Sequence, residues 1–133
     1  MWLLKTEPSS YAYAELEREK KAVWDGVRNP VALKNLRAMK EGDRAVIYHT
    51  GDEKAAVGLA LVTRAAYPDP RAANPKLVVV ELKATGRLPR PVSLAEMRAM
   101  TVFAESPLLR QGRLSVVPLT AAQWGALEAR SRE

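Results

Sequence analysis

The sequence predicts one α+β domain, in which a curled mixed sheet or barrel is flanked by helices. Three observations support this class. The chain has 133 residues, enough for one domain with a buried core. Its apolar, strand-like runs cluster in the middle of the chain, and helix-start signals lie on both sides of them. We therefore expect residues 1–133 to form a single domain.

The first elements are a strand and a short helix. An apolar run at Trp2–Lys5 predicts the strand, and the Pro-Ser-Ser sequence after it ends that strand. Ser9 or Ser10 is placed to cap a helix over residues 13–20.

A second helix follows a short extended segment. Residues 22–24 are extended and end at the Asp25-Gly26 turn. Asn29 and the proline after it match an N-cap and a first helical residue, which predicts a helix over residues 30–40. Gly42 is placed to act as its C-cap.

Three apolar segments predict the centre of the sheet. They are Arg44–Thr50, Ala55–Arg64 and Lys76–Leu82. Residues 51–54 join the first two as a hairpin, whereas residues 67–75 hold three prolines and predict a surface loop. Apolar side chains occupy adjacent as well as alternating positions in these strands. We therefore expect both faces to be covered, or the sheet to curl into a barrel.

Two capping boxes predict the helices of the last third. The boxes occupy residues 93–96 (Ser-Leu-Ala-Glu) and 120–123 (Thr-Ala-Ala-Gln). Residues 88–91 (Leu-Pro-Arg-Pro) are expected to link a strand to the first of these helices. Residues 113–117 predict the last strand.

The charge of the chain favours a polyanionic partner. The net charge is +6, and residues 18–44 carry eight Lys or Arg against four Asp or Glu. Such an excess favours nucleic acid, although scattered basic residues also serve simply to keep a surface soluble. With no cysteine and one histidine, the chain is not expected to hold a metal or a disulfide. No apolar run reaches the ~20 residues that span a bilayer, so we expect a soluble cytoplasmic protein with no membrane contact.

Trp24 is the leading candidate for ligand contact. It directly precedes the Asp25-Gly26 turn, which is expected to place its indole near a rim, and base–aromatic stacking contributes about 1–3 kcal/mol per base. Arg28, followed by Lys34 and Arg37 on the predicted helix, is placed to contact phosphates. The alternatives are a core tryptophan and a solvated basic helix.

Several polar residues are candidates for lining a pocket near Trp24. They are Lys5, Ser9, Ser10, Asn29, Tyr48, His49 and Ser115. Each has a purely structural alternative, such as a capped turn, an N-cap or a hydroxyl satisfied within a strand. The sequence has neither a nucleophile elbow nor a glycine-rich phosphate loop. An enzyme, with His49 or Asp25 as its reactive group, is therefore the least favoured interpretation.

These segments together resemble the EVE domain, a PUA-like family related to the YTH domain. The two longest matches are residues 2–11 (WLLKTEPSSY) and 24–29 (WDGVRN). Shorter ones follow in order: residues 35–40, 42–43, 48–49, 57–60, 66–70 and 113–116. The chain departs from the family at Pro30, where an aromatic residue is common.

The resemblance implies a PUA-like fold and a pocket for a flipped, modified base. By position, Trp24 would be the stacking wall and Lys5, Ser9 and Ser10 would line the pocket from the first loop. Asn29 would lie at the helix edge. Tyr48 and His49 at a strand end and Ser115 on the last strand would complete the lining.

The favoured function is a non-catalytic reader of a modified base, with modified cytosine in DNA as the leading ligand. The alternatives are an RNA-binding PUA-like module and a sensor of a nucleoside or other small ligand. No cofactor and no metal are expected, and a monomer is the expected state.

Overall fold

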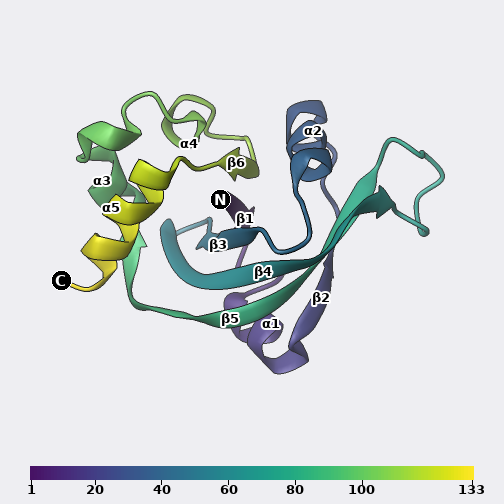
Figure 1. Cartoon of the computed structure of the whole chain (residues 1–133), viewed down its shortest axis with the longest axis horizontal. Coiled ribbons are helices and arrows are strands. Elements are labelled where there is room, and N and C mark those ends of the chain that lie inside the picture. The colour runs from purple at the N-terminus through teal and green to yellow at the C-terminus, as the bar shows by residue number, and fades with distance from the viewer.

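The computed structural model describes residues 1–133 and confirms the α+β class. Six strands form one mixed sheet in the order β2-β5-β4-β3-β1-β6, with helices on its flanks (Figure 1). The elements are β1 (Trp2–Thr6), α1 (Tyr13–Glu19), β2 (Lys21–Trp24), α2 (Pro30–Ala38), β3 (Arg44–His49), β4 (Ala55–Pro68), β5 (Val78–Ser93), α3 (Leu94–Arg98), the 3-10 helix η1 (Thr101–Phe103), α4 (Pro107–Arg110), β6 (Val116–Pro118) and α5 (Ala121–Ser131). β2 and β6 are free edges, so the sheet is open and the alternative of a closed barrel is wrong.

The two longest strands, β4 and β5, give the sheet its curvature. Their antiparallel register shifts at four places, and such bulges bend and twist a strand. β1 pairs with β3 in parallel, and every other neighbouring pair is antiparallel. Figure 1 shows both long strands arching between α1 on one side and α2, α3, α4 and α5 on the other, and meeting in an extension. We call this extension, with residues 69–77 at its tip, the β4–β5 arm.

Residues 88–91, predicted to link a strand to a helix, belong to β5 instead. The register between β4 and β5 shifts here, so that these residues lie opposite Val57 alone. A proline cannot donate to a strand ladder, but an interrupted stretch requires no such donor. β5 therefore continues to Ser93, well beyond the predicted end at Leu82.

The three N-caps with the clearest sequence signals are confirmed. Asn29 Oδ1 accepts hydrogen bonds from two backbone N–H groups in the first turn of α2, at 2.9 and 3.0 Å. Ser93 forms the predicted capping box with Glu96, and Thr120 forms one with Gln123. These local pairs fix where α2, α3 and α5 begin.

Two other predicted caps are wrong. α1 begins after Ala12, whose N–H donates to Glu15 Oε2 at 2.6 Å, so neither Ser9 nor Ser10 caps this helix. α2 ends before Gly42, which lies at φ +92° in the turn leading into β3. Glycine suits that turn because a side chain disfavours positive φ.

The last third of the chain holds two short helices that the sequence did not predict, η1 and α4. The strand predicted at residues 113–117 is shorter and starts at Val116, so Ser115 lies just ahead of β6. None of the helices combines the length and the apolar character needed to cross a bilayer.

Tyr13 ties α1 to the two longest strands. Its side chain is fully buried, its hydroxyl donates to the Leu59 carbonyl at 2.6 Å, and the Gly86 N–H donates to that hydroxyl at 3.1 Å. The ring lies against Gly58, where an added Cβ would come within 2.6 Å of ring Cε2. Gly58 therefore lets α1 approach the sheet closely.

Glu96 joins α3 and α5 to the end of β5. Its carboxylate accepts from Arg90 Nη2 at 2.9 Å, from Arg130 Nε at 2.9 Å and from the Ser93 hydroxyl at 3.2 Å. The hydrogen bonds from Arg90, reinforced by those from Arg130 and Ser93, lower the pKa of Glu96 from 4.5 to about 2. Charge-assisted hydrogen bonds of this kind favour the ionised carboxylate.

Glu96→Gln is expected to lower the free energy of unfolding by about 1–2 kcal/mol at pH 7, because the two arginines lose their shared anion. The folded-state pKa is depressed, so this stabilisation is present above pH 4.5 and is lost as the pH falls toward about 2. Urea unfolding of both proteins across that range measures the difference. Glu105→Gln is the control, because Glu105 is 82% exposed and pairs with Arg110 in solvent. A difference between Glu96→Gln and the original protein that stays constant from pH 7 to pH 2 would contradict this account.

Candidate functional site

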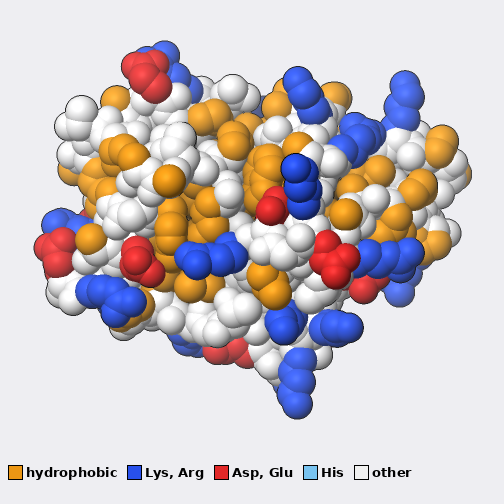
Figure 2. All heavy atoms as spheres, viewed as in Figure 1, with side chains coloured by type: hydrophobic (Ala, Val, Ile, Leu, Met, Phe, Trp, Pro, Cys, Tyr) orange, Lys and Arg blue, Asp and Glu red, His pale blue; other side chains and the backbone are white.

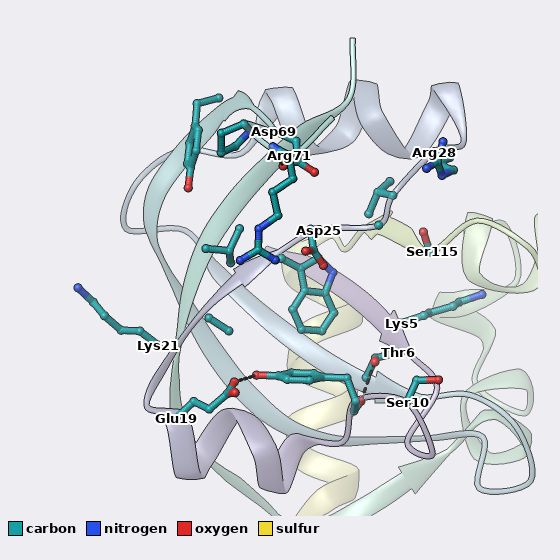
Figure 3. A pocket seen from close by; sticks show the side chains of 18 residues that line it. Lys5, Thr6, Ser10, Glu19, Lys21, Asp25, Arg28, Asp69, Arg71 and Ser115 are labelled. Atoms are coloured by element: carbon teal, nitrogen blue, oxygen red, sulfur yellow. Dashed lines mark hydrogen bonds between the residues drawn. The ribbon is translucent and has the colours of Figure 1, made fainter. Parts of the chain in front are cut away.

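A pocket of about 990 Å³ opens beside the edge strand β2 (Figure 3). Four separate parts of the chain line it. They are the end of β1 with the loop after it, the stretch from the end of α1 through β2 toward α2, residues 67–71 of the β4–β5 arm, and Ser115 ahead of β6. The volume lies within the range of sites that hold small organic ligands. The pocket is therefore a product of the fold and not of one local motif.

Trp24 contributes to the wall of this pocket as the last residue of β2. The sequence predicted a ring near the rim, but the side chain is only 8% exposed and belongs to the main core cluster. Trp24 pairs with Val80 in β5, and its own strand, β2, is the free edge of the sheet. The indole therefore supports the fold and also borders the cavity.

Tyr11 stands edge-on to Trp24 and is a pocket residue that the sequence did not single out. The two ring centroids are 6.0 Å apart and the ring planes meet at 84°. The Tyr11 hydroxyl donates to Glu19 Oε1 at 2.6 Å, and the Thr6 hydroxyl donates to the Tyr11 carbonyl at 2.7 Å (Figure 3). Burial, reinforced by Glu19, raises the pKa of Tyr11 far above its usual value, so the phenol stays protonated.

Lys5 is a half-buried cation with no carboxylate partner. Its Nζ donates to the Gly112 carbonyl at 2.9 Å and lies 5.9 Å from the centroid of the Tyr48 ring. Burial lowers the pKa of the Lys5 ammonium. Figure 3 shows Lys5 and Ser115 on the same side of the pocket, and the Lys5 N–H donates to the Ser115 carbonyl at 2.9 Å. Two of the three ammonium hydrogens remain available to a ligand.

The structure brings five of the predicted residues to the pocket. They are Lys5, Ser10, Trp24, Arg28 and Ser115. Thr6, Tyr11, Glu19, Asp25, Tyr67, Asp69 and Arg71 also line it. Tyr67, Asp69 and Arg71 were not predicted to line a pocket, because residues 67–75 were expected to form a surface loop.

Three predicted pocket residues lie elsewhere. The Ser9 hydroxyl donates to Glu7 Oε1 at 2.8 Å and closes a turn. Asn29 caps α2 and borders a separate groove of about 250 Å³. Tyr48 is almost fully buried within the core cluster. For these residues the structural alternatives stated above describe the observed contacts.

His49 also lies outside the pocket, and the protein uses both of its ring nitrogens. Nε2 accepts a hydrogen bond from the Tyr13 N–H at 3.0 Å, and Nδ1 lies 2.7 Å from Glu53 Oε1. Since Nε2 accepts from a backbone donor, the hydrogen of the neutral ring is on Nδ1 and faces Glu53. His49 therefore connects the start of α1 to the end of β3.

Basic side chains lie in the pocket lining and on α2. Arg28 lines it, Lys34 is exposed on α2, and Arg37 Nη2 donates to the Lys76 carbonyl at 2.7 Å. Figure 2 shows lysine and arginine side chains projecting from the region of α2 and the β4–β5 arm. Arg37 is thus partly engaged in holding the arm against α2, whereas Arg28 and Lys34 make no ion pair within the protein.

Comparisons with known proteins agree with this fold. A family model described as the EVE domain matches residues 1–130. The structure of Rpa0253 from Rhodopseudomonas palustris is 39% identical, with a TM-score of 0.92 over 98% of this chain and 92% of that one. The structure of human THYN1 protein in complex with DNA containing 5-methylcytosine is 27% identical, with a TM-score of 0.92 over 99% and 97% of the two chains. Rat thymocyte nuclear protein 1 is 30% identical, over 92% of this chain and 70% of its own length.

Proposed function

Since the chain belongs to the EVE domain family, we propose that it is a non-catalytic domain that binds nucleic acid and recognises a modified base. Modified cytosine in DNA is the favoured ligand, because the human relative with the same fold forms a complex with DNA containing 5-methylcytosine. The observation that carries the proposal is the pocket itself, in which an indole, unpaired polar groups and an adjacent basic surface come together.

In this proposal the target base leaves the stack and enters the pocket beside Trp24. Extrusion costs a few kcal/mol, which a damaged, modified or unpaired base reduces. Stacking of the base on an indole contributes about 1–3 kcal/mol of binding free energy and so offsets part of this cost. The pocket wall is rigid, because Trp24 is packed in the core and Tyr11 is held by two hydrogen bonds. A preformed wall loses little conformational entropy on binding.

The edge of the base would meet polar groups that have no partner within the protein. The hydroxyls of Ser10 and Ser115 make no hydrogen bond with another residue, and Lys5 has donors to spare. The Asp25 carboxylate is also unpaired, and a carboxylate suits the exocyclic amine of cytosine. Arg28 and Lys34 would hold the phosphates on either side.

The absence of catalysis in this proposal is supported by the contacts of His49. A general base must reach the substrate with a free nitrogen, and both nitrogens of His49 are engaged away from the pocket. Asp25 lines the pocket with no histidine, cysteine or lysine hydrogen-bonded to it, so Asp25 is not part of a nucleophile–base pair.

The deciding experiment is fluorescence-anisotropy binding of single- and double-stranded DNA with one cytosine, 5-methylcytosine or 5-hydroxymethylcytosine at the same position. We expect a modified strand to bind at least about ten-fold more tightly than the unmodified one, at both low and high salt. Equal and strongly salt-dependent affinities for all strands would contradict a modified-base reader and leave only a basic surface. Matched RNA strands and free nucleosides, measured alongside, test the two alternative ligands.

A further inference from the structure

A base held in this pocket has two faces, and Trp24 can cover only one of them. Two other aromatic side chains line the cavity, Tyr11 and Tyr67. Tyr11 is nearly perpendicular to the indole, at 84°, so a base parallel to Trp24 would meet the Tyr11 ring at a steep angle. Tyr11 is therefore not a second stacking wall.

Tyr67 is already engaged within the protein, on one ring face and at its hydroxyl. The guanidinium of Arg64 lies 3.9 Å from the centroid of the Tyr67 ring and covers one face. The Tyr67 hydroxyl donates to Glu81 Oε2 at 2.6 Å, and Arg64 Nη1 donates to the same oxygen at 3.3 Å. Each of these three residues contacts the other two, and together these contacts hold the Tyr67 ring in place.

Two guanidinium groups of the lining have no partner within the protein, Arg28 near the start of α2 and Arg71. Arg71 is the one that reaches into the pocket (Figure 3). Its side chain is exposed, makes no hydrogen bond or ion pair with the protein, and extends from the β4–β5 arm into the pocket (Figure 3). The backbone beneath it is well held. The Arg71 N–H donates to Asp69 Oδ1 at 2.9 Å, and the Asp69 N–H donates to the Leu77 carbonyl at 2.9 Å.

We propose that Arg71 is the second wall of the pocket, with its guanidinium stacked on the face of the base that Trp24 leaves uncovered. This inference rests on the proposed function. A guanidinium is planar, always charged and weakly hydrated, and it stacks on bases and aromatic rings in a way that an ammonium does not. The side chain would move by rotamer changes alone, because the arm that carries it is tied to α2 through Arg37.

The test separates the contribution of the base from that of the phosphates. Two strands are compared, one with 5-methylcytosine and one with an abasic site at the same position, and the ratio of their affinities reports base contacts only. We expect Arg71→Lys and Arg71→Ala each to reduce this ratio by about ten-fold. Arg64→Lys is the matched control on the same arm, and it should leave the ratio within about two-fold. Both positions are exposed, so all three variants are expected to fold, which thermal unfolding checks.

The possible outcomes assign each failure to its cause. The inference is overturned if Arg71→Lys has the same affinity ratio as the original protein. It is also overturned if Arg71→Ala lowers the affinity for both strands equally and reduces the salt dependence of binding. Either result would mean that Arg71 contacts phosphate. If the original protein binds both strands equally, no base is recognised and the proposed function fails with it. If Trp24→Leu abolishes the preference for the 5-methylcytosine strand while both Arg71 variants retain it, the proposed function stands and only the role of Arg71 as second wall is wrong.

Discussion

Trp24→Leu is expected to lower the affinity for a strand with a modified base by about ten- to a hundred-fold, while the protein remains folded. Leucine fills part of the core volume but has no π-face on which a base can stack. Trp24→Ala would be a poorer test, because the residue is only 8% exposed. Truncating a core tryptophan to alanine costs about 3–5 kcal/mol of stability, and a loss of binding would then be ambiguous.

Trp124→Leu is the matched control for that substitution. Trp124 is a half-buried indole on α5, far along the chain from the pocket, and Arg44 lies 5.3 Å from its ring centroid. Anisotropy measurements with the 5-methylcytosine and abasic strands should show a loss for Trp24→Leu and none for Trp124→Leu. If Trp24→Leu binds both strands as the original protein does, the indole does not contact the base, and the proposed stacking wall is wrong.

The features that the sequence predicted well depend on neighbouring residues. Asn29 with the proline after it identified the start of α2, and the Ser93 and Thr120 boxes identified α3 and α5, because a cap needs only the first turn of its own helix. The course of β5 depends instead on its register with β4. A proline-containing segment can lie within a strand where the pairing with the neighbouring strand is interrupted. That interruption depends on β4, so residues 88–91 alone do not predict it.

The pocket was predicted in part for the same reason. Lys5, Ser10 and Trp24 lie in the two long segments that resemble the EVE domain, and their local sequence already made them candidates. Arg71 comes from a loop that is about 47 residues further along the chain than Trp24 and resembles an ordinary proline-rich turn. Tyr48 and His49 were both misplaced, because neither face of β3 at its end opens onto the cavity. Tyr48 packs in the core and His49 contacts the start of α1.

Gly58→Ala is expected to lower the free energy of unfolding by about 3 kcal/mol or more. The added Cβ would lie 2.6 Å from Cε2 of Tyr13 and closer still to Cζ, a separation that real Cβ atoms do not adopt. The ring cannot retreat easily, because its hydroxyl is bonded to the backbone of both β4 and β5 and its own N–H is bonded to His49. Either α1 lifts from the sheet or the sheet moves, and both changes disturb the packing around Trp24.

Gly125→Ala is the control, because Gly125 lies inside α5 with open space where its Cβ would be. That substitution should stabilise the protein by up to about 1 kcal/mol through helix propensity. A double-mutant cycle then tests the cause of the Gly58→Ala effect. If the clash with the ring is responsible, Gly58→Ala should cost much less in a Tyr13→Leu background, with a coupling energy of about 1–3 kcal/mol measured by urea unfolding. If the cost is the same in both backgrounds, the constraint on Gly58 comes from the sheet itself, and the close approach of α1 is not what requires glycine there.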